Sequence, residues 1–214
     1  MNRRHLAALL AALLALGVGL AACGGDDDDG GSSEETIADA AHTDGAFITA
    51  MVPHHESAIE MAEMARDSAQ HPEIAELAEE IIATQGEEIA QLEAAHERLF
   101  DAPLGEVEHG SLGLSEADSG MSHDASALKG AEEFDMEFID MMIPHHQGAI
   151  RMAQVELDSG QDEELMGLAE QIIEAQSAEI EEMNEWREQW YGEPSPSGGV
   201  PEEGATPSHE AMGH

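Results

Sequence analysis

Apolar residues recur three and four positions apart along two long stretches of the chain, which is the spacing of one face of an α-helix. In the first stretch these positions are Phe47, Met51, Ala58, Met61 and Ala62, followed by Ala78, Ile81, Ile82, Ile89 and Leu92. The breaks carry helix-boundary signals: Pro72 suits a first turn, Gly160 can end a helix, and Asp162 can cap the next one. The pattern predicts helices near 46–68, 73–100, 135–158 and 163–191.

The second stretch repeats the first. Residues 44–89 align with residues 135–180 at a constant offset of 91 without a gap, and 23 of the 46 aligned positions are identical. Each copy has the pattern of a helical hairpin, and neither hairpin can bury its apolar stripe alone. The sequence therefore predicts an all-α fold, a single four-helix bundle built from two repeated helical hairpins.

The N-terminus has the features of a targeting segment. Basic residues at 3–5 precede the apolar run 6–20, which is shorter than the roughly 20 residues of a membrane-spanning helix. The run ends in Leu-Ala-Ala-Cys23, which is similar to the cleavage box of bacterial lipoproteins. We expect residues 1–22 to be a signal peptide and Cys23 to be lipidated, which would anchor the protein on the extracytoplasmic face of the cell membrane. The alternative is an ordinary signal peptide with a chance cysteine.

The remaining segments divide by composition. Residues 23–41 are rich in Gly, Ser and Asp and are predicted to be a flexible acidic tether. Residues 42–191 form the duplicated bundle domain, with repeats at about 44–100 and 135–191 and a long, mobile linker at 101–133. The Pro- and Gly-rich tail, 192–214, is predicted to be disordered.

Charge and composition exclude several classes of function. The chain has 47 acidic and 7 basic residues and a formal net charge of −40, which disfavours binding to nucleic acids. A single cysteine excludes a disulfide framework and a Cys-rich zinc site. The sequence contains no nucleophile–base pair, phosphate loop or zinc-protease motif, so we expect no enzymatic activity.

Twelve His and twelve Met are an unusual number for one acidic chain, and the repeats concentrate them. On a helix, Met51 lies one turn before His54 and His55 and shares a broad face with them and Met61. The second repeat supplies Met142, His145, His146 and Met152. Imidazole binds several transition ions, whereas thioether sulfur selects Cu(I). These clusters predict copper binding, with Cu(I) favoured and Cu(II) possible; the alternative is that the methionines only fill the core of a metal-free scaffold or interaction protein.

The hairpin register predicts partners for the imidazoles. A turn near residue 70 places His54 and His55 opposite Gln85 and Glu88. The equivalent partners in repeat two are Gln176 and Glu179. A carboxylate or amide on the second ring nitrogen would fix the tautomer of a metal-binding histidine.

Other residues of the same types have weaker patterns. Pro53 and Pro144 indicate that each helix either starts anew or kinks just before its His pair. We interpret His71, His96 and His109 as ordinary histidines without a metal. The C-terminal His209, Met212 and His214 are open to two interpretations, weak metal capture or no role.

The twin segments Phe-Ile-x-x-Met-x-Pro-His-His-x-x-Ala-Ile-x-Met-Ala resemble the bacterial "domain of unknown function 305" family over about residues 42–191. The resemblance implies a ferritin-like four-helix fold and, since some members bind copper in the periplasm, extracytoplasmic copper binding through the two Met/His clusters. Ferritin-like di-iron enzymes need a Glu-x-x-His motif on each of two helices. Here Glu93-x-x-His96 occurs once, with Asn184 and Arg187 at the equivalent positions, which disfavours a di-metal oxidase.

Overall fold

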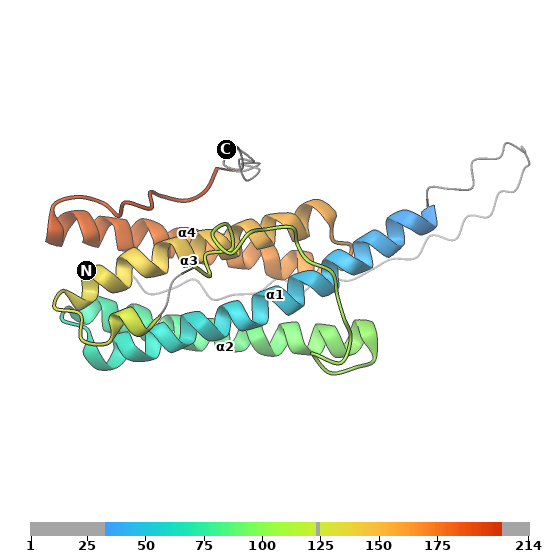
Figure 1. Ribbon diagram of the computed structural model, residues 1–214, viewed down its shortest axis with the longest axis horizontal. Coiled ribbons are helices and arrows are strands. Elements are labelled where there is room, and N and C mark those ends of the chain that lie inside the picture. Colours follow the sequence, from blue (N-terminus) through green and yellow to red (C-terminus); the bar gives the residue numbers. More distant parts are fainter. Residues whose placement is uncertain (1–32, 123–124, 203–214) are drawn as a thin grey trace, which may run out of the picture.

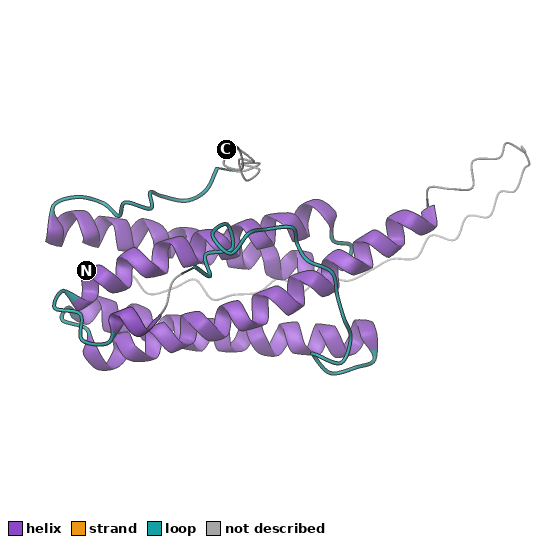
Figure 2. Cartoon of the chain, viewed as in Figure 1, coloured by secondary structure: helices purple, strands orange, loops and turns teal. Residues whose placement is uncertain are grey.

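The computed structural model of the chain describes residues 33–122 and 125–202, and this part contains no β-strand. It forms four long helices and one short 3-10 helix (Figures 1 and 2). The helices are α1 (Ser33–Ser68), α2 (Pro72–Phe100), α3 (Phe134–Ser159) and α4 (Glu163–Tyr191), and the 3-10 helix is η1 (Ala125–Leu128). The prediction of an all-α bundle of two helical hairpins is confirmed.

The two hairpins pack against each other mainly through α1 and α3, which run antiparallel (Figure 1). The helices α2 and α4 pack on the outer sides of this pair and contact each other much less. As the periodicity predicts, the apolar stripes of all four helices face inward, and they form two adjoining clusters of buried side chains. Of the helices in the described part of the chain, none is long and apolar enough to cross a membrane.

The predicted boundary signals lie at the helix ends. Pro72 occupies the first turn of α2, and Gly160 is the C-cap of α3. The Asp162 side chain accepts a hydrogen bond from the backbone N–H of Leu165 and so caps α4. These local signals act within a few residues, which is why the sequence alone locates them.

The structure excludes one of the two alternatives that the sequence left open at each proline. The helices α1 and α3 continue through Pro53 and Pro144, so neither helix starts anew before its His pair. A proline removes only one backbone donor. Buried neighbours on both sides, such as Val52 and Ala58, hold the helix against the core.

Three segments predicted to be flexible or disordered contain ordered backbone. The helix α1 begins at Ser33, inside the predicted tether. The linker buries Leu128 in the core, and the first residues of the predicted tail lie along the bundle, where Gln147 donates hydrogen bonds to the carbonyls of Ser197 and Gly199. Composition indicated mobility in these segments because Gly, Ser and Pro are abundant, but composition does not report the helix, the buried side chain or the hydrogen bonds found there.

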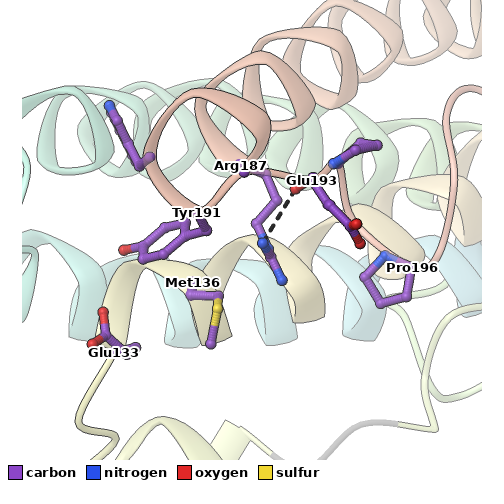
Figure 3. Close-up of a pocket in the computed structure, with 9 residues that line it drawn as sticks. Glu133, Met136, Arg187, Tyr191, Glu193 and Pro196 are labelled. Carbon is purple, nitrogen blue, oxygen red and sulfur yellow. Dashed lines mark hydrogen bonds between the residues drawn. The ribbon is translucent and has the colours of Figure 1, made fainter.

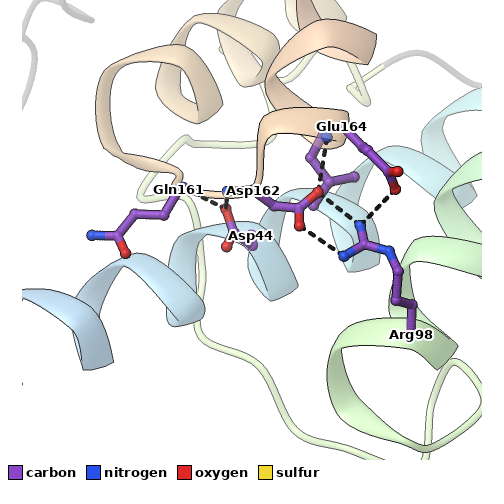
Figure 4. A network of polar contacts seen from close by, with 6 residues as sticks. Asp44, Arg98, Gln161, Asp162 and Glu164 are labelled. Carbon is purple, nitrogen blue, oxygen red and sulfur yellow. Dashed lines mark hydrogen bonds and ion pairs between the residues drawn. The ribbon is translucent and has the colours of Figure 1, made fainter. Parts of the chain in front are cut away.

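Each hairpin clamps the turn of the other one. The buried Asp44 of α1 accepts backbone hydrogen bonds from Gln161 and Asp162 in the α3–α4 turn, at 2.9 and 3.4 Å (Figure 4). Its equivalent, Asp135 of α3, accepts from the backbone of Gln70 and His71 in the α1–α2 turn, at 2.9 and 2.8 Å. The two clamps are related by the sequence offset of 91, so the duplication extends to tertiary contacts.

The clamps differ in their second partner. His71 brings its Nδ1 within 2.7 Å of Asp135 at one end of the bundle. At the other end, the buried Glu156 lies beside Asp44, and the guanidinium of Arg98 binds both carboxylate oxygens of Asp162 (Figure 4). Repeat one has Ala65 in place of Glu156, so a pair of buried carboxyl groups occurs at only one of the two clamps.

Candidate metal centre

The two His pairs meet where α1 crosses α3. The rings of His54 and His145 face each other with centroids 3.7 Å apart. His55 and His146 lie on either side, 6.3 Å from His54 and 6.4 Å from His145, respectively. All four side chains are at most 2% exposed. We call these four residues the central histidine group; each repeat contributes half of it.

The backbone of the linker sets the tautomer of His54. Its Nε2 lies 3.0 Å from the carbonyl oxygen of Ser119, and a carbonyl can only accept, so Nε2 carries the proton and donates. The lone pair is then on Nδ1, which is buried and has no hydrogen-bond partner. Burial, with smaller contributions from the charges of His55 and His146, lowers the pKa of His54 to about 3. This ring is therefore neutral at physiological pH, as metal binding requires.

Carboxylates set the tautomers of the outer two rings. The Nε2 of His146 lies 2.6 Å from Oε2 of Glu179, and the Nε2 of His55 lies 2.9 Å from Oε2 of Glu88, although the second contact is poorly aligned for a hydrogen bond. Both carboxylates are the partners that the hairpin register predicts. They favour a proton on Nε2, which leaves the lone pair on Nδ1 in both rings.

The buried Nδ1 atoms are the chemical peculiarity of this site. Those of His54, His55 and His146 have no hydrogen-bond partner, and the amide oxygens of the buried Gln85 and Gln176 have none either. An unpaired buried polar atom costs about 1–3 kcal/mol. A bound cation would satisfy these lone pairs, so the donor set fits a metal with imidazole ligands. Both glutamines are buried, but their amide oxygens form no hydrogen bond with the imidazoles that the register predicts as partners.

The methionines are grouped across the repeats rather than within them. Met51 of α1 and Met152 of α3 belong to one apolar cluster, and Met61 and Met142 belong to the other. All four are at most 2% exposed. The antiparallel crossing of α1 and α3 causes this exchange, so thioethers of both repeats lie on each side of the central histidine group. From the sequence, the methionines of each repeat were predicted to group with the histidines of the same repeat. The structure corrects this grouping, because each apolar cluster contains one of these methionines from each repeat.

No three His, Cys, Asp or Glu side chains in the described ranges are already gathered around one ion-sized point. That set of residue types leaves out methionine. An ion at the central histidine group would therefore need thioether ligands or a small shift of the rings.

Sequence reasoning did not find the segment that covers the histidines. Residues 115–122, which we call the strap, lie over α3 beside the central histidine group. A Cβ on Gly148 would overlap the backbone of Ser119, and one on Gly120 would overlap the backbone of Pro144 and His145. Arg151 holds the strap from the side by donating to the carbonyl of Asp118. The signal was the pair of glycines, which has meaning only once the two backbones are seen in contact.

Two predicted features lie outside the described residues. These are the lipidation site Cys23 and the C-terminal residues His209, Met212 and His214.

The family model described as "Domain of unknown function (DUF305)" matches residues 44–187 and 135–214 of the chain. No curated protein shows significant similarity to this chain.

Solved structures extend the comparison. The structure "CopM in the Cu(II)-bound form" is 40% identical, with a TM-score of 0.62, and the match covers 69% of this chain and 97% of CopM. "CopM in the Cu(I)-bound form" is also 40% identical, with a TM-score of 0.60 and coverage of 70% and 98%. A DUF305 fragment from Deinococcus radiodurans is 28% identical, with a TM-score of 0.59 and coverage of 69% and 96%.

Proposed function

This chain belongs to the DUF305 family, and on that premise we propose that it is a copper-binding protein whose central histidine group and flanking thioethers hold the ion. The observation that carries the proposal is the set of buried, unpaired Nδ1 atoms between two groups of buried methionines. The similarity to CopM, which has been crystallised in Cu(I)-, Cu(II)- and Ag-bound forms, supports the choice of metal.

The ligand chemistry favours Cu(I). Thioether sulfur is a soft ligand that selects Cu(I), while imidazole accepts both oxidation states. The four imidazoles and the four thioethers are at most 2% exposed, which disfavours the water ligands that Cu(II) usually retains. We propose that the protein sequesters or transfers copper and does not turn over a substrate, because the chain lacks the second Glu-x-x-His motif of a di-metal oxidase.

Replacing Met51, Met61, Met142 and Met152 together with Leu tests the choice of ligands. Leu keeps the apolar volume of Met, so the bundle should fold with nearly unchanged helical content. The affinity for Cu(I) is expected to fall by about 100-fold or more, and that for Cu(II) by much less, because only the thioethers discriminate between the two ions. Competition with a Cu(I) chelator and, separately, with a Cu(II) chelator measures the difference. Equal losses for both ions would exclude thioether ligands.

The matched control replaces Met166 and Met183 with Leu. Met183 is buried in the core and Met166 lies on α4, but neither follows the repeated Met-x-Pro-His-His pattern. This control should leave both affinities unchanged. If the control loses Cu(I) as strongly as the quadruple variant, the effect is one of packing.

We further propose that the protein is anchored by a lipid on Cys23 at the extracytoplasmic face of the cell membrane. The support is the Leu-Ala-Ala-Cys box at the end of a short apolar run. Cys23→Ser should block lipid attachment and move the protein from the membrane fraction to the soluble fraction. Fractionation and the intact mass of the mature N-terminus measure this, with Ser33→Ala as a control that should remain in the membrane. Unchanged mass and fraction for Cys23→Ser would refute the anchor.

A further inference from the structure

A second group of histidines lies at one end of the bundle, away from the central histidine group. His96 is fully buried near the end of α2, His109 extends from the linker, and His42 is an exposed residue of α1. The Nε2 atoms of His96 and His109 are 2.8 Å apart. We call these three residues the end histidines.

The turn after α2 prepares His96 as a ligand. Asp101 ends the helix in a left-handed conformation, with φ 50° and ψ 33°, and the next carbonyl, that of Ala102, lies 2.8 Å from Nδ1 of His96. Nδ1 therefore donates to this carbonyl, and the lone pair of the neutral ring is on Nε2, facing His109. Donation of one ring nitrogen to a backbone carbonyl is the usual arrangement of a metal-binding histidine.

Gly45 allows the His109 ring to pack directly against the backbone of α1. A Cβ on Gly45 would overlap the His109 ring, so only glycine allows this approach. His42 lies one helical turn before Gly45 and therefore on the same side of α1. Burial, followed by the charges of His96 and His42, lowers the pKa of His109. Phe100, 4.3 Å from His109 between ring centroids, supplies an apolar wall.

At the opposite end of the bundle, the duplication provides an equivalent location whose residues are not histidines. By the offset of 91, the equivalents of His42, Gly45, His96 and Phe100 are Glu133, Met136, Arg187 and Tyr191. There they line an open pocket of about 970 Å³, in which Arg187 donates a hydrogen bond to the carbonyl of Glu193 (Figure 3). Arg187 also donates to the carboxylate of Asp140. At one end of the bundle, two imidazoles are therefore in contact where the equivalent residues at the other end leave an open pocket.

We propose that His42, His96 and His109 form a second metal site, independent of the central one, which takes a divalent transition ion of the borderline class, Cu(II) most tightly. The donors are imidazoles without thioether, a set that suits borderline ions, and Cu(II) has the highest affinity of the divalent first-row ions for such ligands. The high negative charge of the chain adds a general attraction for cations.

The contact between His96 and His109 could become a metal site through one proton shift and a small movement of the His109 ring. The proton shared between the two Nε2 atoms moves to Nδ1 of His109, so that both Nε2 atoms present lone pairs and both rings stay neutral. At metal–nitrogen distances of about 2.0–2.1 Å, the two nitrogens must separate from 2.8 Å to roughly 3–4 Å. Because His109 is on the linker, this movement does not disturb a helix. His42 is exposed and can rotate to become the third ligand.

Cu(II) added to the full chain tests the proposal through electron paramagnetic resonance and competition with a Cu(II) chelator. His109→Ala should lower the affinity of this site by about 100-fold or more and reduce the number of coupled nitrogens, and His42→Ala should do so less strongly. His71→Ala, a partly exposed histidine at the other end of the bundle, should have no effect. If His109→Ala binds Cu(II) like the wild type, with the same nitrogen coupling, the proposal is wrong.

Gly45→Ala gives a test that removes no ligand. The new Cβ should displace the His109 ring and weaken Cu(II) binding about as much as His109→Ala does. Gly86→Ala is the control, since a Cβ there meets open space. Substoichiometric Cu(II) should also broaden the amide NMR signals of Gly45 and Phe100 in the wild type, a measurement that needs no variant. Sharp signals at both positions would overturn the site. The result of these Cu(II) experiments is independent of Cu(I) binding at the central histidine group.

Discussion

Replacing His54, His55, His145 and His146 together with Leu is expected to abolish tight Cu(I) binding while the four-helix bundle remains folded. All four imidazoles lie buried at the α1–α3 crossing. In the proposed function they would supply every nitrogen ligand of the central site. Their loss should weaken Cu(I) binding by more than about 1000-fold, equivalent to about 4 kcal/mol. Competition with a Cu(I) chelator measures this, and circular dichroism measures the helical content.

Leu is a better replacement than Ala because the four histidine side chains are buried. Ala at four buried positions would leave cavities at the interface that joins the hairpins, and each could cost several kcal/mol. Leu has nearly the volume of His and carries no polar atoms, so it also removes the unpaired Nδ1 atoms. We therefore expect equal or greater resistance to urea. A variant that folds and still competes with the chelator like the wild type would show that these residues are packing, and it would favour the metal-free scaffold.

Glu156→Gln is expected to remove a large pH dependence of stability. Burial, followed by the neighbouring carboxyl group of Asp44, raises the pKa of Glu156 from 4.5 to about 8. Between these values the folded chain retains a proton that the unfolded chain has lost. The free energy of unfolding of the wild type should therefore fall as the pH rises from about 4.5 to 8, by an amount on the order of 4 kcal/mol. Above about pH 8 the carboxyl is ionised in both states, and this loss stops.

Urea unfolding between pH 4.5 and pH 8.5 measures the effect. Gln keeps the shape of the side chain and does not titrate, so the variant should be close to the wild type at pH 4.5 and more stable by about 4 kcal/mol at pH 8.5. Asp158→Asn is the matched control, because Asp158 is exposed on the same helix. Parallel pH profiles for the wild type and Glu156→Gln would contradict the assignment of a buried, protonated carboxyl group.

Local chemistry explains what the sequence determined by itself. The apolar periodicity and the duplication can be read directly from the chain, and they predicted the fold. The capping residues Pro72, Gly160 and Asp162 act within a turn or two of helix, and they predicted most helix boundaries. The proximity of His55 to Glu88, and of His146 to Glu179, followed from the register of one hairpin, which depends on a single short turn.

Only the tertiary structure decided how the two hairpins combine. The antiparallel crossing of α1 and α3 brings His54 onto His145 and exchanges the methionines between repeats, so that the candidate site belongs to neither repeat alone. The contact of Ser119 with His54 and the seat of His109 on Gly45 depend on linker residues whose composition indicated only mobility. Periodicity reports which face of a helix is buried. It does not report which other helix or loop covers that face, because this depends on contacts between residues far apart in the chain.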